Sequence, residues 1–119
     1  MTPLDYLLFD FSDEEGGAGS FDAMASVLPD RLPALICEIE TVLRWAHRAF
    51  GAPSADEGDW DFELQATCAP DAPLNAVYDA TSGRLSLSPD CDARTTLSLT
   101  LSGSHAFCQA FRHAFPAAD

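Results

Sequence analysis

The sequence predicts an α+β fold, a two-layer sandwich in which two helices pack on one face of a mostly antiparallel sheet. Residues 96–101 alternate polar and apolar side chains, which is the period of a strand with one buried face. Phe107, Phe111 and Phe115 then recur every fourth residue, which places three aromatic rings on one face of a helix. Four consecutive segments show strand patterns, at residues 59–66, 74–80, 84–88 and 96–101. Consecutive strands of this kind favour an antiparallel meander. The expected order is β-α-β-β-β-β-α, in a single domain that spans residues 1–119.

The N-terminal strand is expected at residues 4–11, where aromatic and aliphatic side chains on both faces indicate a central position in the sheet. Residues 12–20 combine acidic side chains with three glycines and are expected to form a loop. Ser20 is a candidate N-cap for a short helical turn that ends before Pro29.

The longest helix is expected at residues 30–50, with Asp30 as its N-cap and Pro33 in its first turn. Gly51 and Pro53 are typical of the residues that follow the end of a helix. The apolar residues of this segment follow the spacing of one buried stripe: Leu32, Leu35, Ile36, Ile39, Leu43, Ala46 and Phe50.

The clearest strand pattern covers residues 59–66, where Trp60, Phe62 and Leu64 are expected to face the core and the intervening acids to face water. A hairpin is expected from residues 74–80 and 84–88, with Gly83 at the turn position that requires a positive φ. Residues 116–119 are expected to be a frayed tail.

The charge of the chain is strongly negative, with 19 Asp and Glu against 6 basic residues and a net charge of −13. Such a surface repels phosphate backbones and anionic headgroups, so we expect no nucleic acid and no membrane as partner. A basic protein is the natural complement, although the charge can also serve solubility alone. All six basic residues are Arg, a usage typical of GC-rich genomes, and we expect a bacterial source.

The start of the chain predicts a cytoplasmic location, because residues 1–5 lack the basic and apolar parts of a signal peptide. The chain contains no run of about 18 apolar residues that could span a bilayer. Cysteines in the cytoplasm are expected to be reduced thiols. Their scattered spacing predicts neither a zinc site nor a redox motif: Cys37, Cys68, Cys91 and Cys108.

Asp59, Asp61 and Glu63 alternate along one strand, so their carboxylates are expected to leave one sheet face in a row about 7 Å apart. Three interpretations are open: a solvated polar face, a patch for a basic partner, or a site for a hard cation. The strand row diverges, and the stretch from Asp10 to Asp22 lacks the glycine and glutamate positions of a calcium loop. We therefore expect no metal and no cofactor.

His105 and Cys108 lie three residues apart at the start of the last helix, where a helix N-terminus favours a thiolate. This pair is a weak candidate for a nucleophile, and a buried cysteine beside a surface histidine is the alternative. The sequence contains neither a G-x-S-x-G elbow nor an H-E-x-x-H zinc motif. An enzymatic role is therefore not favoured.

Trp45, with Arg44 and Arg48 beside it in the long helix, has the composition of an interface anchor. The alternative is that Trp45 forms a half-buried lid on the core. The two arginines could meet an acidic surface, including that of another copy of this chain in a homodimer.

The sequence favours a non-enzymatic, acidic interaction module that binds a basic or amphipathic protein. Immunity proteins and secretion chaperones have roles of this kind, but no motif links the chain to either. One alternative is a small enzyme or ligand-binding domain with its site near His105 and Cys108. Another alternative is a structural protein that forms homo-oligomers.

Overall fold

The computed structural model describes residues 6–13, 18–53 and 59–115. The expected tail at residues 116–119 and residues 14–17 of the expected glycine-rich loop lie outside these residues, as does the start of the chain at residues 1–5.

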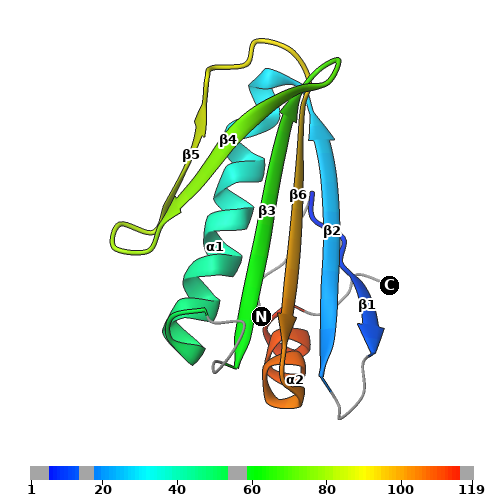
Figure 1. The fold of residues 1–119 in the computed structure, drawn as a ribbon, viewed down its shortest axis with the longest axis vertical. Helices are drawn as coiled ribbons and strands as arrows, with labels where there is room; N and C mark the ends of the chain where they lie inside the picture. The colour runs from blue at the N-terminus through cyan, green and yellow to red at the C-terminus, as the bar shows by residue number, and fades with distance from the viewer. Residues whose placement is uncertain (1–5, 14–17, 54–58, 116–119) are drawn as a thin grey trace.

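Six antiparallel strands form one sheet in the order β1-β2-β6-β3-β4-β5. Two helices, α1 (Leu32–Phe50) and α2 (His105–Ala114), lie on the same face of this sheet (Figure 1). The predicted α+β sandwich is thus confirmed. The order of helices and strands from β2 to α2 is the predicted one, and one additional short strand, β1, precedes it. The strand bounds are β1 Asp10–Asp13, β2 Gly19–Val27, β3 Trp60–Cys68, β4 Ala72–Asp79, β5 Arg84–Ser88 and β6 Thr95–Gly103.

The N-terminal segment differs from the prediction, because residues 19–27 form strand β2 and not a loop followed by a helical turn. Phe21, Ala23 and Val27 are buried, whereas Met24 on the other face is 68% exposed. β2 pairs with β6 along all nine of its residues, so its backbone is satisfied by the sheet. The strand expected at residues 4–11 is correspondingly replaced by the shorter β1.

The long helix agrees with its prediction except at its first residues. Asp30 lies in a turn of 3-10 helix, η2 (Pro29–Arg31), and the residue before α1 is Arg31, which makes no capping bond through its side chain. The expected apolar stripe is buried at Leu35, Ile39 and Leu43. Gly51 ends the helix with a φ of 80°.

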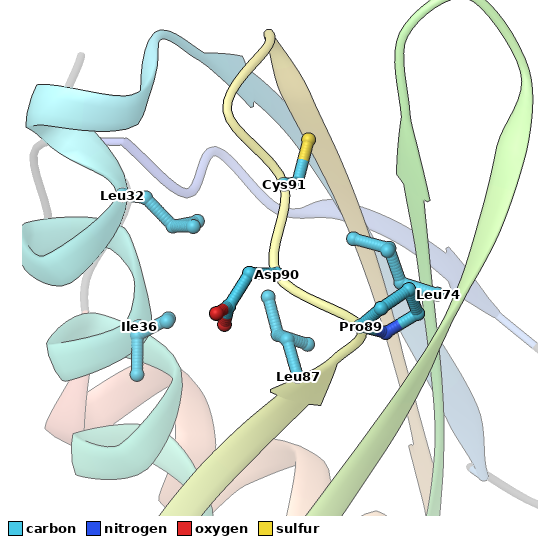
Figure 2. Close-up of a pocket in the computed structure, with 7 residues that line it drawn as sticks. All are labelled: Leu32, Ile36, Leu74, Leu87, Pro89, Asp90 and Cys91. Atoms are coloured by element: carbon cyan, nitrogen blue, oxygen red, sulfur yellow. The ribbon is translucent and has the colours of Figure 1, made fainter.

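The β4–β5 hairpin leaves the plane of the sheet and lies against α1 (Figure 1). β4 pairs with β3 only over residues 72–74 and with β5 over residues 75–79. Gly83 has the positive φ predicted for it, 71°, and its N–H donates to the carbonyl of Asp79. An apolar groove opens between β5 and the first turns of α1 (Figure 2).

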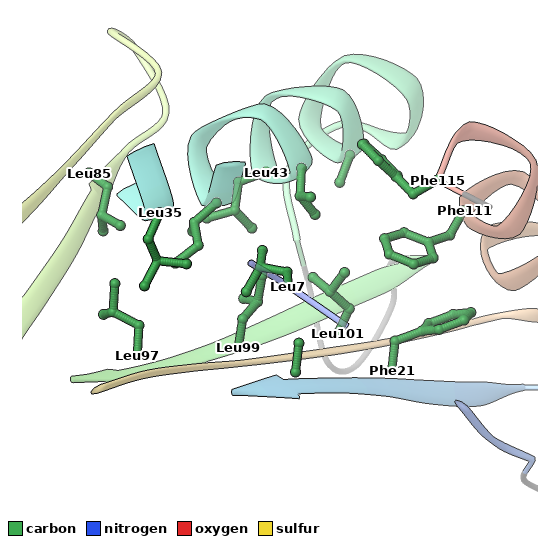
Figure 3. Close-up of a cluster of buried hydrophobic side chains, with 14 of the residues drawn as sticks. Leu7, Phe21, Leu35, Leu43, Leu85, Leu97, Leu99, Leu101, Phe111 and Phe115 are labelled. Carbon is green, nitrogen blue, oxygen red and sulfur yellow. The ribbon is translucent and has the colours of Figure 1, made fainter. Parts of the chain in front are cut away.

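The core lies between the helices and the sheet (Figure 3). Leu97, Leu99 and Leu101 of β6 are fully buried beneath the helices. The predicted aromatic face of α2 is buried as well, and it also meets rings of other elements. Phe111 lies with its ring centroid 4.4 Å from that of Phe21, and Phe107 stacks on Trp60 at 5.7 Å.

A disulfide joins Cys68 at the end of β3 to Cys91 in the connection before β6. The prediction of four reduced thiols is therefore wrong. The two cysteines are 23 residues apart in sequence, and the pairing of β3 with β6 brings them together by placing Cys68 opposite Thr95. Disulfides are typical of oxidising compartments, and the expected cytoplasmic location stays a prediction.

Candidate functional site

No described helix covers the face of the sheet opposite α1 and α2 (Figure 1). On β2, β6 and β3 the buried residues point to the core, so the alternate residues point outward. The strand register places these outward residues in rows across the three strands: Ser20, Ser102 and Asp61; Asp22, Thr100 and Glu63; Met24, Ser98 and Gln65; Ser26, Thr96 and Thr67. We call this surface the open face.

The open face gathers carboxylates from three strands. Asp10 on β1 lies opposite Asp22 on β2, and Glu63 on β3 belongs to the same row. Thr100 lies between Asp22 and Glu63, and its hydroxyl donates a 2.7 Å hydrogen bond to the Asp22 carboxylate. Asp61 lies in the next row. Within these rows of described residues, every charged side chain is acidic.

Like charges directly opposite each other on neighbouring strands destabilise a sheet, so the pair Asp10 and Asp22 has an energetic cost. Arg94 lies at the far end of β2 and donates to the Ser26 carbonyl at 3.1 Å. A cationic surface placed on the open face would relieve the repulsion between the carboxylates.

Of the three acids predicted as a row, the structure places Asp61 and Glu63 on the open face and uses Asp59 differently. The Asp59 carbonyl accepts the Ser104 N–H at 2.8 Å, and its carboxylate accepts the Ser104 hydroxyl at 3.4 Å. Ser104 is the N-cap of α2, and its hydroxyl accepts the Phe107 N–H. Asp59 thus holds the start of α2. Asp56 and Glu57, two further acids shortly before Asp59 in the sequence, lie outside the described residues.

The sequence pattern did not predict Asp22 on the open face, because the segment that carries it was expected to form a helical turn. The signal that would have found Asp22 is the alternation of Phe21, Ala23 and Val27, which has the period of a strand. Asp10 follows from Asp22 through the β1–β2 pairing.

Trp45 and the two arginines beside it point to different parts of the molecule. The half-buried Trp45 ring lies within 6.0 Å of the rings of Phe50, Phe107, Phe111 and Phe115, measured between centroids. Arg44 forms a 3.7 Å ion pair with Glu40 and lies close to Gly83 in the β4–β5 turn. Arg48 is exposed. This placement corresponds to the alternative in which Trp45 is a lid on the core.

The side chains of His105 and Cys108 lie close to different residues. His105 is exposed, and its Nε2 lies 3.2 Å from the side-chain nitrogen of Gln109. Cys108 is 3% exposed, and its thiol lies 3.7 Å from the Gly103 carbonyl. The arrangement that a thiol–imidazole pair needs for nucleophilic chemistry is a direct hydrogen bond between the two groups. The contacts described for these two side chains are with other residues.

A second polar cluster joins α1 to the β4–β5 hairpin. The Glu40 carboxylate is buried and accepts the Leu85 N–H at 2.8 Å. The Tyr78 hydroxyl is also buried and has no hydrogen-bond partner among the described residues. Burial raises the pKa of the Tyr78 phenol, and the nearby Arg44 opposes this effect. The cluster fastens the hairpin to the helix.

In the part of the chain that the structure describes, no group of three His, Cys, Asp or Glu side chains has the geometry to hold a metal ion. Neither described helix combines the length and the apolarity needed to cross a membrane. Comparisons of the chain with protein-family models, with curated proteins and with solved structures find no match.

Proposed function

We propose that this protein is a non-enzymatic interaction module whose open face binds a basic or amphipathic protein. The observation that supports the proposal is the set of four carboxylates, from Asp10, Asp22, Asp61 and Glu63, on a sheet face that neither described helix covers (Figure 1). The net charge of −13 strengthens the field of this face and speeds the approach of a cationic partner.

The open face also offers one apolar contact. Met24 is 68% exposed and shares a row with Ser98 and Gln65, next to the row of Asp22 and Glu63. Methionine is flexible and polarisable and adapts to different apolar partners. The combination favours a partner that presents basic side chains around an apolar one, as an amphipathic helix or strand does.

The test measures the binding of a fluorescently labelled, lysine-rich amphipathic peptide by anisotropy, at low and at physiological ionic strength. The test variant carries Asp22→Asn, Asp61→Asn and Glu63→Gln together. These changes remove charge, and the amide oxygen introduced at position 22 could still accept the Thr100 hydrogen bond. The control variant carries Asp30→Asn, Asp71→Asn and Asp92→Asn, which are exposed and lie in η2 and in two connections.

Both variants have the same net charge, so the comparison separates the open face from the charge of the whole molecule. We expect the open-face variant to weaken binding by roughly tenfold or more, because several charge contacts are lost together. The control should bind within about twofold of the unmodified protein, because its charges act only at long range. Equal weakening in the two variants would contradict the proposal.

A further inference from the structure

The outer edge of strand β5 faces helix α1 and is only partly occupied. β5 is the last strand of the sheet, and its one neighbour is β4. The Leu85 N–H points away from β4, because it donates to the carboxylate of Glu40 on α1. Alternate residues of an antiparallel strand direct their backbone groups to the same edge. The Leu87 N–H and carbonyl therefore point to the same edge as the Leu85 N–H, and no described residue forms a hydrogen bond with them.

The apolar groove lies beside this part of the edge (Figure 2). Its volume is about 280 Å³, and its walls include Leu32 and Ile36 of α1, Leu74 of β4 and Leu87. Ile36 lies one helical turn before Glu40. The groove therefore begins next to the part of the β5 edge that is hydrogen-bonded to Glu40.

One charged residue, Asp90, contributes to the described lining of the groove. Its side chain is exposed, and in Figure 2 it lies between α1 and the end of β5. The groove therefore combines three features in one place: open backbone groups of a strand edge, apolar walls, and a carboxylate.

We propose that this groove binds an extended peptide segment of a partner protein, which adds to β5 as a further strand at Leu87. An apolar side chain of the segment enters the space between Ile36 and Leu87. A Lys or Arg two positions along the segment pairs with Asp90, because alternate residues of a strand share a face. This site is separate from the open face and does not depend on the function proposed for it.

The residues that line the groove favour an extended peptide over two other occupants, an acyl chain and a second copy of the chain. An acyl chain offers no backbone groups to Leu87, and its carboxylate would meet Asp90 with the same charge. A second copy of the chain brings few cations to an acidic groove, because it carries 6 basic residues against 19 acidic ones. A short basic and apolar strand satisfies the backbone, the walls and the carboxylate together.

The test uses a labelled, end-blocked heptapeptide of serine and threonine that contains one leucine and, two positions later, one arginine. Its binding is measured by fluorescence anisotropy up to millimolar concentration. Ile36→Arg should weaken binding by at least about tenfold, because it fills the groove with a charge and removes an apolar wall. Val77→Arg is the matched control: Val77 lies on the same hairpin, is 51% exposed and does not line the groove. This variant should bind like the unmodified protein.

Two further measurements examine the contacts separately. Asp90→Asn should weaken binding and reduce its dependence on salt, because the ion pair is lost. A peptide methylated on the backbone nitrogens that face β5 should lose most of its affinity, since strand addition needs those N–H groups.

Three results would overturn the proposal: no binding of the heptapeptide, equal binding by Ile36→Arg, or equal binding of the methylated peptide. Association of the protein with itself that Ile36→Arg abolishes would also overturn it, because the occupant would then be a second copy. The variant of Asp22, Asp61 and Glu63 should bind the heptapeptide normally, so a failure at one site is distinguishable from a failure at the other.

Discussion

Glu40 is a buried carboxylate that joins α1 to the edge of the sheet. It accepts the Leu85 N–H and pairs with Arg44. Glu40→Ala leaves the Leu85 N–H without this partner, so we expect the free energy of unfolding to fall by about 2–3 kcal/mol. Urea denaturation measures this change. Glu40→Gln should recover part of the loss, because an amide oxygen can still accept the bond.

The control for this prediction is Glu63→Ala, an exposed acid of the open face. It should change the free energy of unfolding by no more than about 0.5 kcal/mol. Equal effects of Glu40→Ala and Glu63→Ala would show that the bond to Leu85 does not hold the hairpin.

The Tyr78 hydroxyl is buried without a partner among the described residues, so its removal should not weaken the fold. Tyr78→Phe should leave the free energy of unfolding near pH 7 unchanged, or raise it by up to about 1 kcal/mol, because no unsatisfied group remains. Urea denaturation of the two proteins is the measurement. A loss of more than about 1 kcal/mol would mean that the hydroxyl forms a bond.

The same substitution should change the response to alkali. Burial raises the pKa of Tyr78 above its ordinary value of 10.0, so the folded protein keeps the phenol proton when the unfolded chain has lost it. The contribution of Tyr78 to the free energy of unfolding is therefore fully present below about pH 10. It falls as the pH rises toward the pKa of the folded state. Tyr78→Phe should show a smaller fall between about pH 9 and pH 11.

At the scale of elements, the sequence predicted those segments whose apolar period is unbroken. β3, the β4–β5 hairpin, β6 and both helices follow from such periods and from turn residues such as Gly83. β2 does not follow from such a period, because its small residues weaken the alternation of apolar and polar side chains. Gly19 shows why one of them is needed, since a Cβ atom there would lie 2.6 Å from the Phe11 ring.

The disulfide could not be predicted, because it depends on a contact between distant segments. Cys68 and Cys91 approach only when β6 pairs with β3, and the spacing of 23 residues gives no sign of that pairing. The candidate site was predicted in part for the same reason. Asp61 and Glu63 follow from the pattern of their own strand, whereas Asp10 and Asp22 join them through strand pairing.

The disulfide closes the segment that contains the β4–β5 hairpin. A variant with Cys68→Ser and Cys91→Ser should lose about 3 kcal/mol of stability, because the unfolded chain is no longer constrained by the loop. Thermal unfolding measures the loss. The control is Cys37→Ser, an exposed cysteine outside the disulfide, which should unfold at nearly the unmodified temperature. If the double variant were as stable as this control, the disulfide would have no stabilising role.

At the scale of the whole molecule, the fold separates two surfaces. The helices and the β4–β5 hairpin cover one face of the sheet and leave the groove beside β5. The other face remains open and carries the aligned acids. The two proposed binding sites therefore lie on different parts of the molecule, and each can be changed without touching the other.

The most direct test of the open face is a map of where a basic partner binds. The lysine-rich amphipathic peptide is titrated into isotope-labelled protein, and backbone amide shifts are followed by NMR at low ionic strength. We predict that the largest shifts fall on β2, β6 and β3 around Asp22, Thr100 and Glu63, and that added salt reverses them. Shifts centred on α1, or spread evenly over the acidic surface, would contradict the proposed role of the open face.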